Sequence, residues 1–379
     1  MSEEGFLDAQ VEFSLRLLKE LGVDSTVSTV LSPISIVLAL SLAYAGADGE
    51  TRQEFDDVFA KGQSKDQLHE SFRKLGEFLA PSADRQYTLE TANKNTYKQV
   101  VDQFYNGTFE SLDFGKPFDV AQNVNSFVKE KTRDKIQDLI SLYIILQADS
   151  ILNDTKMVLV NAIYYKGDWK TKFDKNNTEE KDFFADENNT AKVKMMKKSF
   201  KVAYYEHKDF QLVGLPYANE DIFFYAILPT EKFGLNKLLS ELKADQLREL
   251  INIRHKTEVV VELPQFKIKT SANLKGQLVK LGFKQGFSNS ANFRGISDEE
   301  LKIDEVIHKA FIEASSICSE ATNEEGSEAA AATGLTMRLL SAGPAREEPP
   351  HFLADHPFLF VLTGKDSQIL FVGTVRNFD

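Results

Sequence analysis

Cysteine is almost absent from this sequence, because Cys318 is the single one among 379 residues. A lone cysteine excludes an internal disulfide framework and any zinc site built from cysteines. Common enzyme motifs are absent as well, since the chain contains no G-x-S-x-G elbow, no P-loop, no G-x-G-x-x-G loop and no H-E-x-x-H pair. We therefore expect a protein that is not an enzyme and that has no catalytic residue, no metal and no cofactor.

Basic side chains are also fewer than acidic ones. The sequence has 45 basic against 57 acidic side chains, a formal net charge of −12. This balance argues against nucleic acid, and against an anionic membrane, as the main partner. The acidic start of the chain lacks the basic and apolar parts of a signal peptide. We expect a cytoplasmic protein, or one that is secreted without a recognisable signal peptide.

One uncharged stretch, residues 25–47, is long enough to span a bilayer. It contains Pro33 and several Ser and Thr residues, however, so its mainly apolar part covers only about residues 34–45. Ser32 and Pro33 are typical of a helix start, with Ser as the N-cap and Pro at the first helical position. The stretch is therefore predicted to be a buried core helix and not a membrane span.

Apolar residues are plentiful. Hydrophobic side chains make up 42% of the chain and aromatic ones 11%, which is enough for a sizeable core, and no repeat or linker divides the sequence. Apolar spacing predicts helices over residues 7–18, after Ser32 and over residues 120–138. Apolar runs predict strands at 157–165 (buried on both faces), 221–228 and 258–263, and a terminal hairpin from residues 358–362 and 369–372. Helices followed by strands, without strict alternation, predict an α+β fold.

A few polar side chains are candidates for a site. His351 and His356 lie five residues apart with Asp355 between them, which is a weak metal signal, and a surface loop accounts for the pair better. His308 and Asn161 each lie in an apolar run, where a buried polar side chain needs a hydrogen-bond partner. We interpret both as structural residues rather than as catalytic ones.

The segment from Asn323 to Phe352 is the unusual part of the chain, and by itself it could be an irregular surface loop or a short helix. Its alternate residues are uncharged and become apolar: Ser327, Ala329, Ala331, Thr333, Leu335, Met337 and Leu339. The intervening residues carry both charges, Glu328 and Arg338. This period of two is typical of a strand with one buried side. Gly and Ala are poor strand formers, so the segment can stay outside as a loop or enter a sheet where a slot opens.

Several phrases of the sequence, in this order and spacing, are similar to those of the serpin family. They are the hinge sequence at residues 324–333 and the segments 161–169, 195–196, 215–217, 263–267, 291–296, 306–310 and 356–360. The chain resembles a serpin of the inhibitory type over nearly its whole length, and within the family it resembles the intracellular ovalbumin-like group. The resemblance implies one domain over residues 1–379, with a helical region, three β-sheets and an exposed reactive-centre loop at about residues 326–351.

The resemblance also implies a function, that of a suicide-substrate inhibitor of serine proteases. The protease attacks a bait bond and forms an acyl-enzyme, and the cleaved loop then inserts into the central sheet and distorts the protease before water can deacylate it. Counting along the family pattern from Gly326, and back from Phe352, places the bait bond at Leu340–Ser341. Such a bond suits a chymotrypsin-like protease with an apolar S1 pocket. The alternative bond Arg338–Leu339 would suit trypsin-like enzymes, and papain-like cysteine proteases are a further possible target.

Other positions acquire roles only through the resemblance. The hinge comprises Gly326, Ser327, Glu328, Ala329, Ala330, Ala331, Ala332 and Thr333. A polar cluster that controls opening of the central sheet comprises Ser32, Ser35, Asn161 and His308. Trp169 and Thr178 match positions where the loop first enters the sheet. The implied partner is a serine protease in a covalent complex, and we expect a monomer.

The chain departs from the family pattern at one place. About eight extra residues, 315–322, separate the strand around His308 from the hinge, and they include Cys318. Such an insertion would affect the rate at which the loop enters the sheet. It leaves open a non-inhibitory serpin, a chaperone or a carrier, although the small residues of the hinge argue against that alternative.

Overall fold

The computed structural model describes residues 3–23, 25–79, 86–89, 97, 108–110, 117–131, 157–218, 220–314, 348–364 and 366–378. The predicted hinge (residues 326–333), both predicted bait bonds and the apparent insertion at residues 315–322 lie outside these ranges.

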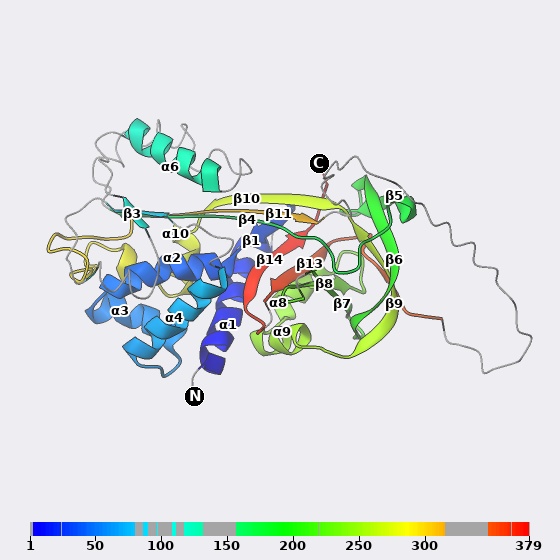
Figure 1. The fold of residues 1–379 in the computed structure, drawn as a ribbon, viewed down its shortest axis with the longest axis horizontal. Helices are drawn as coiled ribbons and strands as arrows, with labels where there is room; N and C mark the ends of the chain where they lie inside the picture. The colour runs from blue at the N-terminus through cyan, green and yellow to red at the C-terminus, as the bar shows by residue number, and fades with distance from the viewer. Residues whose placement is uncertain are drawn as a thin grey trace, which may run out of the picture.

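Helices from the first part of the chain gather at one end of the molecule (Figure 1). They are α1 (Glu3–Gly22), α2 (Pro33–Gly46), α3 (Gly49–Phe55) with its π-helical continuation η1 (Asp56–Ala60), and α4 (Lys65–Leu79). Every residue of α2 except Ala45 is buried, as predicted for a core helix, and Ser32 occupies the N-cap position. None of the described helices is both long and apolar enough to cross a membrane.

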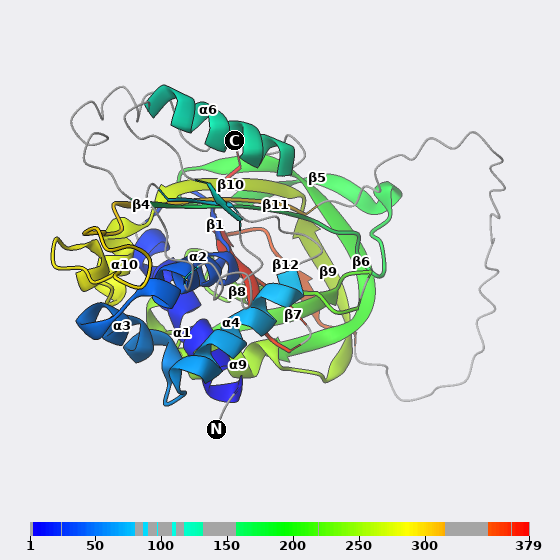
Figure 2. The same ribbon diagram turned by 60° about the vertical axis from the view of Figure 1, so that its left-hand side comes forward.

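The other helices within the described ranges are α6 (Pro117–Lys131), α8 (Leu235–Glu241), α9 (Ala244–Ile251) and α10 (Lys275–Leu281), with short 3₁₀ turns η3 (Lys175–Asn177) and η4 (Gln285–Phe287). The helix predicted over residues 120–138 begins earlier, at Pro117, which is well placed in a first turn because its missing N–H has no partner to lose there. In both views α6 lies on the opposite side of the sheet that contains β4 and β11 from α2 (Figures 1 and 2).

A five-stranded sheet runs through the centre, in the order β10 (Phe266–Asn273), β11 (Glu305–Ala314), β4 (Met157–Lys166), β2 (Gln86–Leu89) and β3 (Thr108–Glu110). β10 is antiparallel to β11, whereas β11 and β4 are parallel. The prediction that residues 157–165 are buried on both faces is wrong for the second half of β4. Tyr164 is only partly buried and Lys166 is exposed, because the outer face of that end meets solvent.

A nine-stranded sheet contains the other strands. Its order is β1 (Thr29–Leu31), β14 (Ile369–Val375), β13 (Phe358–Thr363), β8 (Phe223–Pro229), β7 (Phe210–Pro216), β6 (Thr190–Glu206), β9 (Lys256–Pro264) and β12 (His351–Leu353), with β5 (Thr178–Phe184) also paired to β6. The long strand β6 pairs with β5 and β9 along its first part and with β7 at its end. The sheet therefore has two portions that share β6, and together with the five-stranded sheet they correspond to the three sheets that the resemblance implies.

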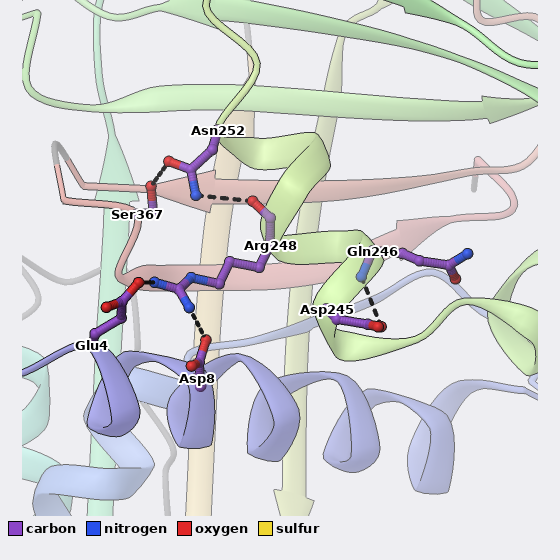
Figure 3. A network of polar contacts seen from close by, with 7 residues as sticks. All are labelled: Glu4, Asp8, Asp245, Gln246, Arg248, Asn252 and Ser367. Carbon is purple, nitrogen blue, oxygen red and sulfur yellow. Dashed lines mark hydrogen bonds and ion pairs between the residues drawn. The ribbon is translucent and has the colours of Figure 1, made fainter. Parts of the chain in front are cut away.

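The predicted C-terminal hairpin is confirmed, with β13 antiparallel to β14. The turn between β13 and β14 is hydrogen-bonded to Asn252, the residue that follows α9 (Figure 3). Ser367 Oγ donates to Asn252 Oδ1 at 2.6 Å, and Asn252 Nδ2 donates to the Arg248 carbonyl at 2.9 Å. The Arg248 guanidinium at the same time forms ion pairs with Glu4 and Asp8 of α1. α9 thus connects the two ends of the chain.

Candidate functional site

The central feature of the site is the boundary between β4 and β11. The two strands pair in parallel from Val158 opposite Glu305 to Lys166 opposite Glu313. β11 ends at Ala314, and the described chain resumes at Glu348, just before β12. The predicted reactive loop therefore connects the end of a central strand to an edge strand of the other sheet. A loop strand that enters the sheet on the β4 side of β11 would have to separate β11 from β4.

A polar cluster on the inner face spans this boundary. Asn161 on β4 accepts a hydrogen bond from Ser35 Oγ at 2.8 Å and donates to the Ser35 carbonyl at 2.9 Å. His308 Nδ1 on β11 lies 2.9 Å from the same Asn161 oxygen. The backbone N–H of Ser32 donates to His308 Nε2 at 3.2 Å. The structure thus brings together all four residues of the expected sheet-opening cluster, and His308 and Asn161 have the hydrogen-bond partners predicted for them.

The protonation state of His308 follows from these contacts. Nε2 accepts a hydrogen from the Ser32 backbone, so the ring proton is on Nδ1, which donates to Asn161. The ring is fully buried, and this burial lowers the pKa of His308 to about 3. A neutral ring therefore joins β11 to β4 and to the start of α2 at neutral pH.

One hydroxyl of the cluster is not satisfied. Ser32 is fully buried, but its Oγ has no hydrogen-bond partner within the described part of the chain and does not cap α2. An unpaired buried hydroxyl costs free energy, so Ser32 Oγ destabilises this state of the cluster.

Two further side-chain contacts cross the boundary on the outer face. The rings of Tyr164 and Phe311, which are register partners, have centroids 5.4 Å apart. The Lys166 ammonium and the Glu313 carboxylate lie 3.4 Å apart. The Lys166–Glu313 contact was not predicted from the sequence. An acidic residue inside the apolar run of β11 was a signal for it, although the partner depends on strand register.

Trp169 follows the end of β4 and packs against Tyr217, with ring centroids 4.6 Å apart and an interplanar angle of 19°. Both side chains are buried, and neither Trp169 Nε1 nor Tyr217 Oη has a hydrogen-bond partner among the described residues. Burial raises the pKa of Tyr217 well above its ordinary value, so its hydroxyl stays protonated. Thr178 begins β5, opposite Met196, and donates to the Asp174 carbonyl at 3.3 Å.

The far end of the predicted loop is held at β12. The Pro350 carbonyl accepts from the Val260 N–H at 2.9 Å, and β12 then pairs in parallel with β9. Phe352, the aromatic residue expected beyond the loop, is fully buried. The loop boundary predicted at about residue 351 therefore falls on the first residue of β12.

Glu262 on β9 secures this edge strand. Its side chain is 2% exposed and forms ion pairs with Lys181 and, at 3.0 Å, with Lys197. His351 Nε2 lies 3.1 Å from the same carboxylate. Burial alone would raise the pKa of Glu262, but the hydrogen bonds and charges of the two lysines outweigh it and hold the pKa below its ordinary value. The charged carboxylate thus joins neighbouring strands of the sheet to β12.

The surface-loop interpretation of the two C-terminal histidines was wrong for His356. This side chain is buried, with Nδ1 2.7 Å from Asp355 Oδ1 and Nε2 2.8 Å from the Pro229 carbonyl oxygen. His356 follows β12 into the core, and the residues around it gave no signal that its side chain would be buried. Within the described ranges, no group of three or more His, Cys, Asp or Glu side chains is placed to hold a metal ion.

Comparisons with known proteins identify this arrangement. The family model described as Serpin (serine protease inhibitor) matches residues 8–378. Serpin B6 of Pongo abelii is 34% identical over 385 residues, with 97% of each chain covered. Serpin B4 of Homo sapiens is 33% identical, with 97% of each chain covered.

Solved serpin structures have the same fold as this chain. Serpin48 of the insect Tenebrio molitor has a TM-score of 0.81 and 27% identity, with both chains covered completely. Uncleaved ovalbumin has a TM-score of 0.82 and 27% identity, covering 98% of this chain and 100% of ovalbumin. Serpins are generally inhibitors of proteases rather than enzymes, and the α+β fold with its central parallel strand pair is theirs. The chain belongs to the serpin family.

Proposed function

We propose that this protein is a suicide-substrate inhibitor of serine proteases. The observation that carries the proposal is the β4–β11 boundary. The two strands form a parallel ladder that side-chain contacts cross on both faces, and β11 leads into a segment whose alternate residues are small or apolar. Because the loop and the sheet belong to the same chain, a monomer is sufficient for this function.

The chemistry takes place at the bait bond, which we place at Leu340–Ser341. The protease serine oxygen bonds to the Leu340 carbonyl carbon, the bond to the Ser341 nitrogen breaks, and that nitrogen takes a proton to become a new amino terminus. The protease is left as an ester on Leu340. Deacylation needs an aligned triad and oxyanion hole, so pulling the ester across the molecule stops the reaction at this step.

Insertion of the cleaved loop supplies the driving force. Each new ladder hydrogen bond contributes about 1 kcal/mol net, and burial of Leu335, Met337 and Leu339 adds roughly 1.5–3 kcal/mol each. Their alternation places these three side chains on one face, which would be the inner face of the five-stranded sheet. The loop would enter between β4 and β11 and pair with both.

Leu340 favours a chymotrypsin-like target with an apolar S1 pocket. Arg338–Leu339 is the alternative bond and would select trypsin-like proteases, and Leu339 also suits papain-like cysteine proteases. Mixing the protein with chymotrypsin, trypsin and papain in turn, followed by denaturing gels and mass spectrometry, distinguishes these. With chymotrypsin we expect a covalent band at the mass of the protease plus residues 1–340, and a released fragment that begins at Ser341. A fragment that begins at Leu339 would support the alternative.

A non-inhibitory serpin, such as a chaperone or a carrier, is the second candidate because of the extra residues 315–322. Such a protein would be clipped by chymotrypsin without any covalent band. Thermal melting of the clipped protein provides an independent measurement. An inhibitor should become markedly more heat-resistant after cleavage, and an unchanged melting temperature would contradict the proposed function.

A further inference from the structure

Glu313 forms ion pairs with both strands that neighbour β11. Its Oε1 atom lies 3.4 Å from Lys166 Nζ on β4 and 3.7 Å from Lys267 Nζ on β10. We propose that the Lys166–Glu313 pair is a clasp that keeps β4 and β11 together where the loop must enter, and so slows insertion. The proposal rests on the inhibitory function proposed above.

The position of the pair gives it this role. Lys166 is the last residue of β4, and Glu313 is its register partner one residue before the end of β11. A strand that starts to insert from the Ala314 end therefore meets this pair first. The Tyr164–Phe311 contact lies next along the outer face, and the His308–Asn161 hydrogen bond lies farther down on the inner face. The contacts across the boundary would break in that order.

Insertion must break the Lys166 pair but not the Lys267 pair. An added strand between β4 and β11 moves the two strands from about 4.8 Å to about 10 Å apart, too far for the side chains to keep contact at 3.4 Å. β10 and β11 remain neighbours, because their antiparallel ladder from Phe266–Ala314 to Asn273–Ile307 lies on the other side of β11. Of these two ion pairs of Glu313, insertion would break the one to Lys166 and leave the one to Lys267 in place.

Partial burial strengthens the Lys166–Glu313 ion pair. The Glu313 side chain is 10% exposed and that of Lys166 is 36% exposed, whereas Lys267 is 67% exposed. A partly buried ion pair is screened less by salt than an exposed one. Lys166 is the better shielded of the two lysines, so we expect its ion pair with Glu313 to contribute more to stability than the Lys267 pair does.

The variants Lys166→Gln and Lys267→Gln form a matched pair, because each removes one positive charge from Glu313. Hydrogen exchange of the backbone amides in β4 and β11 reports opening of the boundary in the intact protein, without any protease. We expect Lys166→Gln to raise exchange at residues 160–166 and 309–314 about two- to fivefold. Lys267→Gln should leave it at the wild-type rate, and the conservative Lys166→Arg should restore that rate.

Salt provides a second readout. Raising the ionic strength from about 0.02 to 0.5 M should speed exchange in the wild type and in Lys267→Gln, because salt screens the Lys166–Glu313 ion pair. It should not speed exchange in Lys166→Gln, which lacks that ion pair. Equal effects of the two glutamine substitutions, or no effect of either, would overturn the clasp. A wild type that forms no covalent band with chymotrypsin would instead contradict the inhibitory function, whatever the exchange rates show.

Discussion

His308 Nδ1 lies 2.9 Å from Asn161 Oδ1, and this hydrogen bond joins β11 to β4 across the boundary that a loop strand would open. Both side chains are buried, and the Ser32 backbone and the Ser35 hydroxyl complete their hydrogen bonding. The cluster is therefore both a stabilising contact of the folded protein and a set of bonds that sheet opening must break.

Replacing Asn161 with alanine should destabilise the protein. The substitution leaves the buried His308 N–H without its acceptor and removes the donor to the Ser35 carbonyl, which costs about 1–3 kcal/mol. A lower urea midpoint of unfolding would show this. Asn176, which is exposed at η3, serves as the control, and Asn176→Ala should leave the midpoint unchanged. An equal loss in both variants would contradict a special role for the cluster.

Stability should fall in mild acid because of His308. Burial lowers its pKa from 6.5 to about 3 in the folded protein, so the unfolded chain binds the proton more readily. The free energy of unfolding is then independent of this group above about pH 6.5 and decreases as the pH falls from there towards 3, by up to about 1.4 kcal/mol per pH unit. Urea midpoints between pH 7.5 and 5 measure this slope.

The control for the pH effect is His308→Gln, in which this part of the slope should disappear. Burial also lowers the pKa of His69, to about 4, and so His69 adds a slope of the same sign. The difference between wild type and His308→Gln isolates His308. If the two proteins respond identically to pH, the buried neutral ring does not contribute as described.

The face of the hinge can be tested with one pair of substitutions. Thr333 belongs to the uncharged alternate set of the loop, and Ala332 belongs to the intervening set. Thr333→Arg would place a charge in the core upon insertion and should convert an inhibitor into a substrate, whereas Ala332→Arg should retain most inhibition. The ratio of covalent band to clipped chain after chymotrypsin treatment measures both. The reverse ranking would contradict the proposed alternation.

Replacing Glu262 with glutamine should loosen β12. The substitution removes the charge that pairs with Lys181 and Lys197 and leaves two lysines facing each other, so a loss of about 1–3 kcal/mol is expected. Faster hydrogen exchange at residues 350–353 would detect it. Glu258 lies on the same strand but is exposed, and Glu258→Gln should leave the exchange unchanged.

Local patterns in the sequence were sufficient for many elements. The uncharged run after Ser32-Pro33 predicted the buried helix α2, and the apolar runs predicted β4, β8 and β9, because a continuous apolar run and a helix-start signal depend only on neighbours in the chain. The burial pattern was harder to predict. The exposed end of β4 and the buried His356 both depend on which other elements cover them.

Residue order was enough to predict α1, α2, α6, β4, β8, β9 and the β13–β14 hairpin, the resemblance to serpins and the alternation of the proposed reactive loop, since all of these are local patterns in the chain. Which charged groups meet depends instead on how the strands pair. Glu313 contacts Lys166, and Glu262 contacts Lys181, Lys197 and His351, because strand register brings together residues that are far apart in the chain. A shift of one residue in that register would turn each side chain to the opposite face of its sheet and remove these contacts.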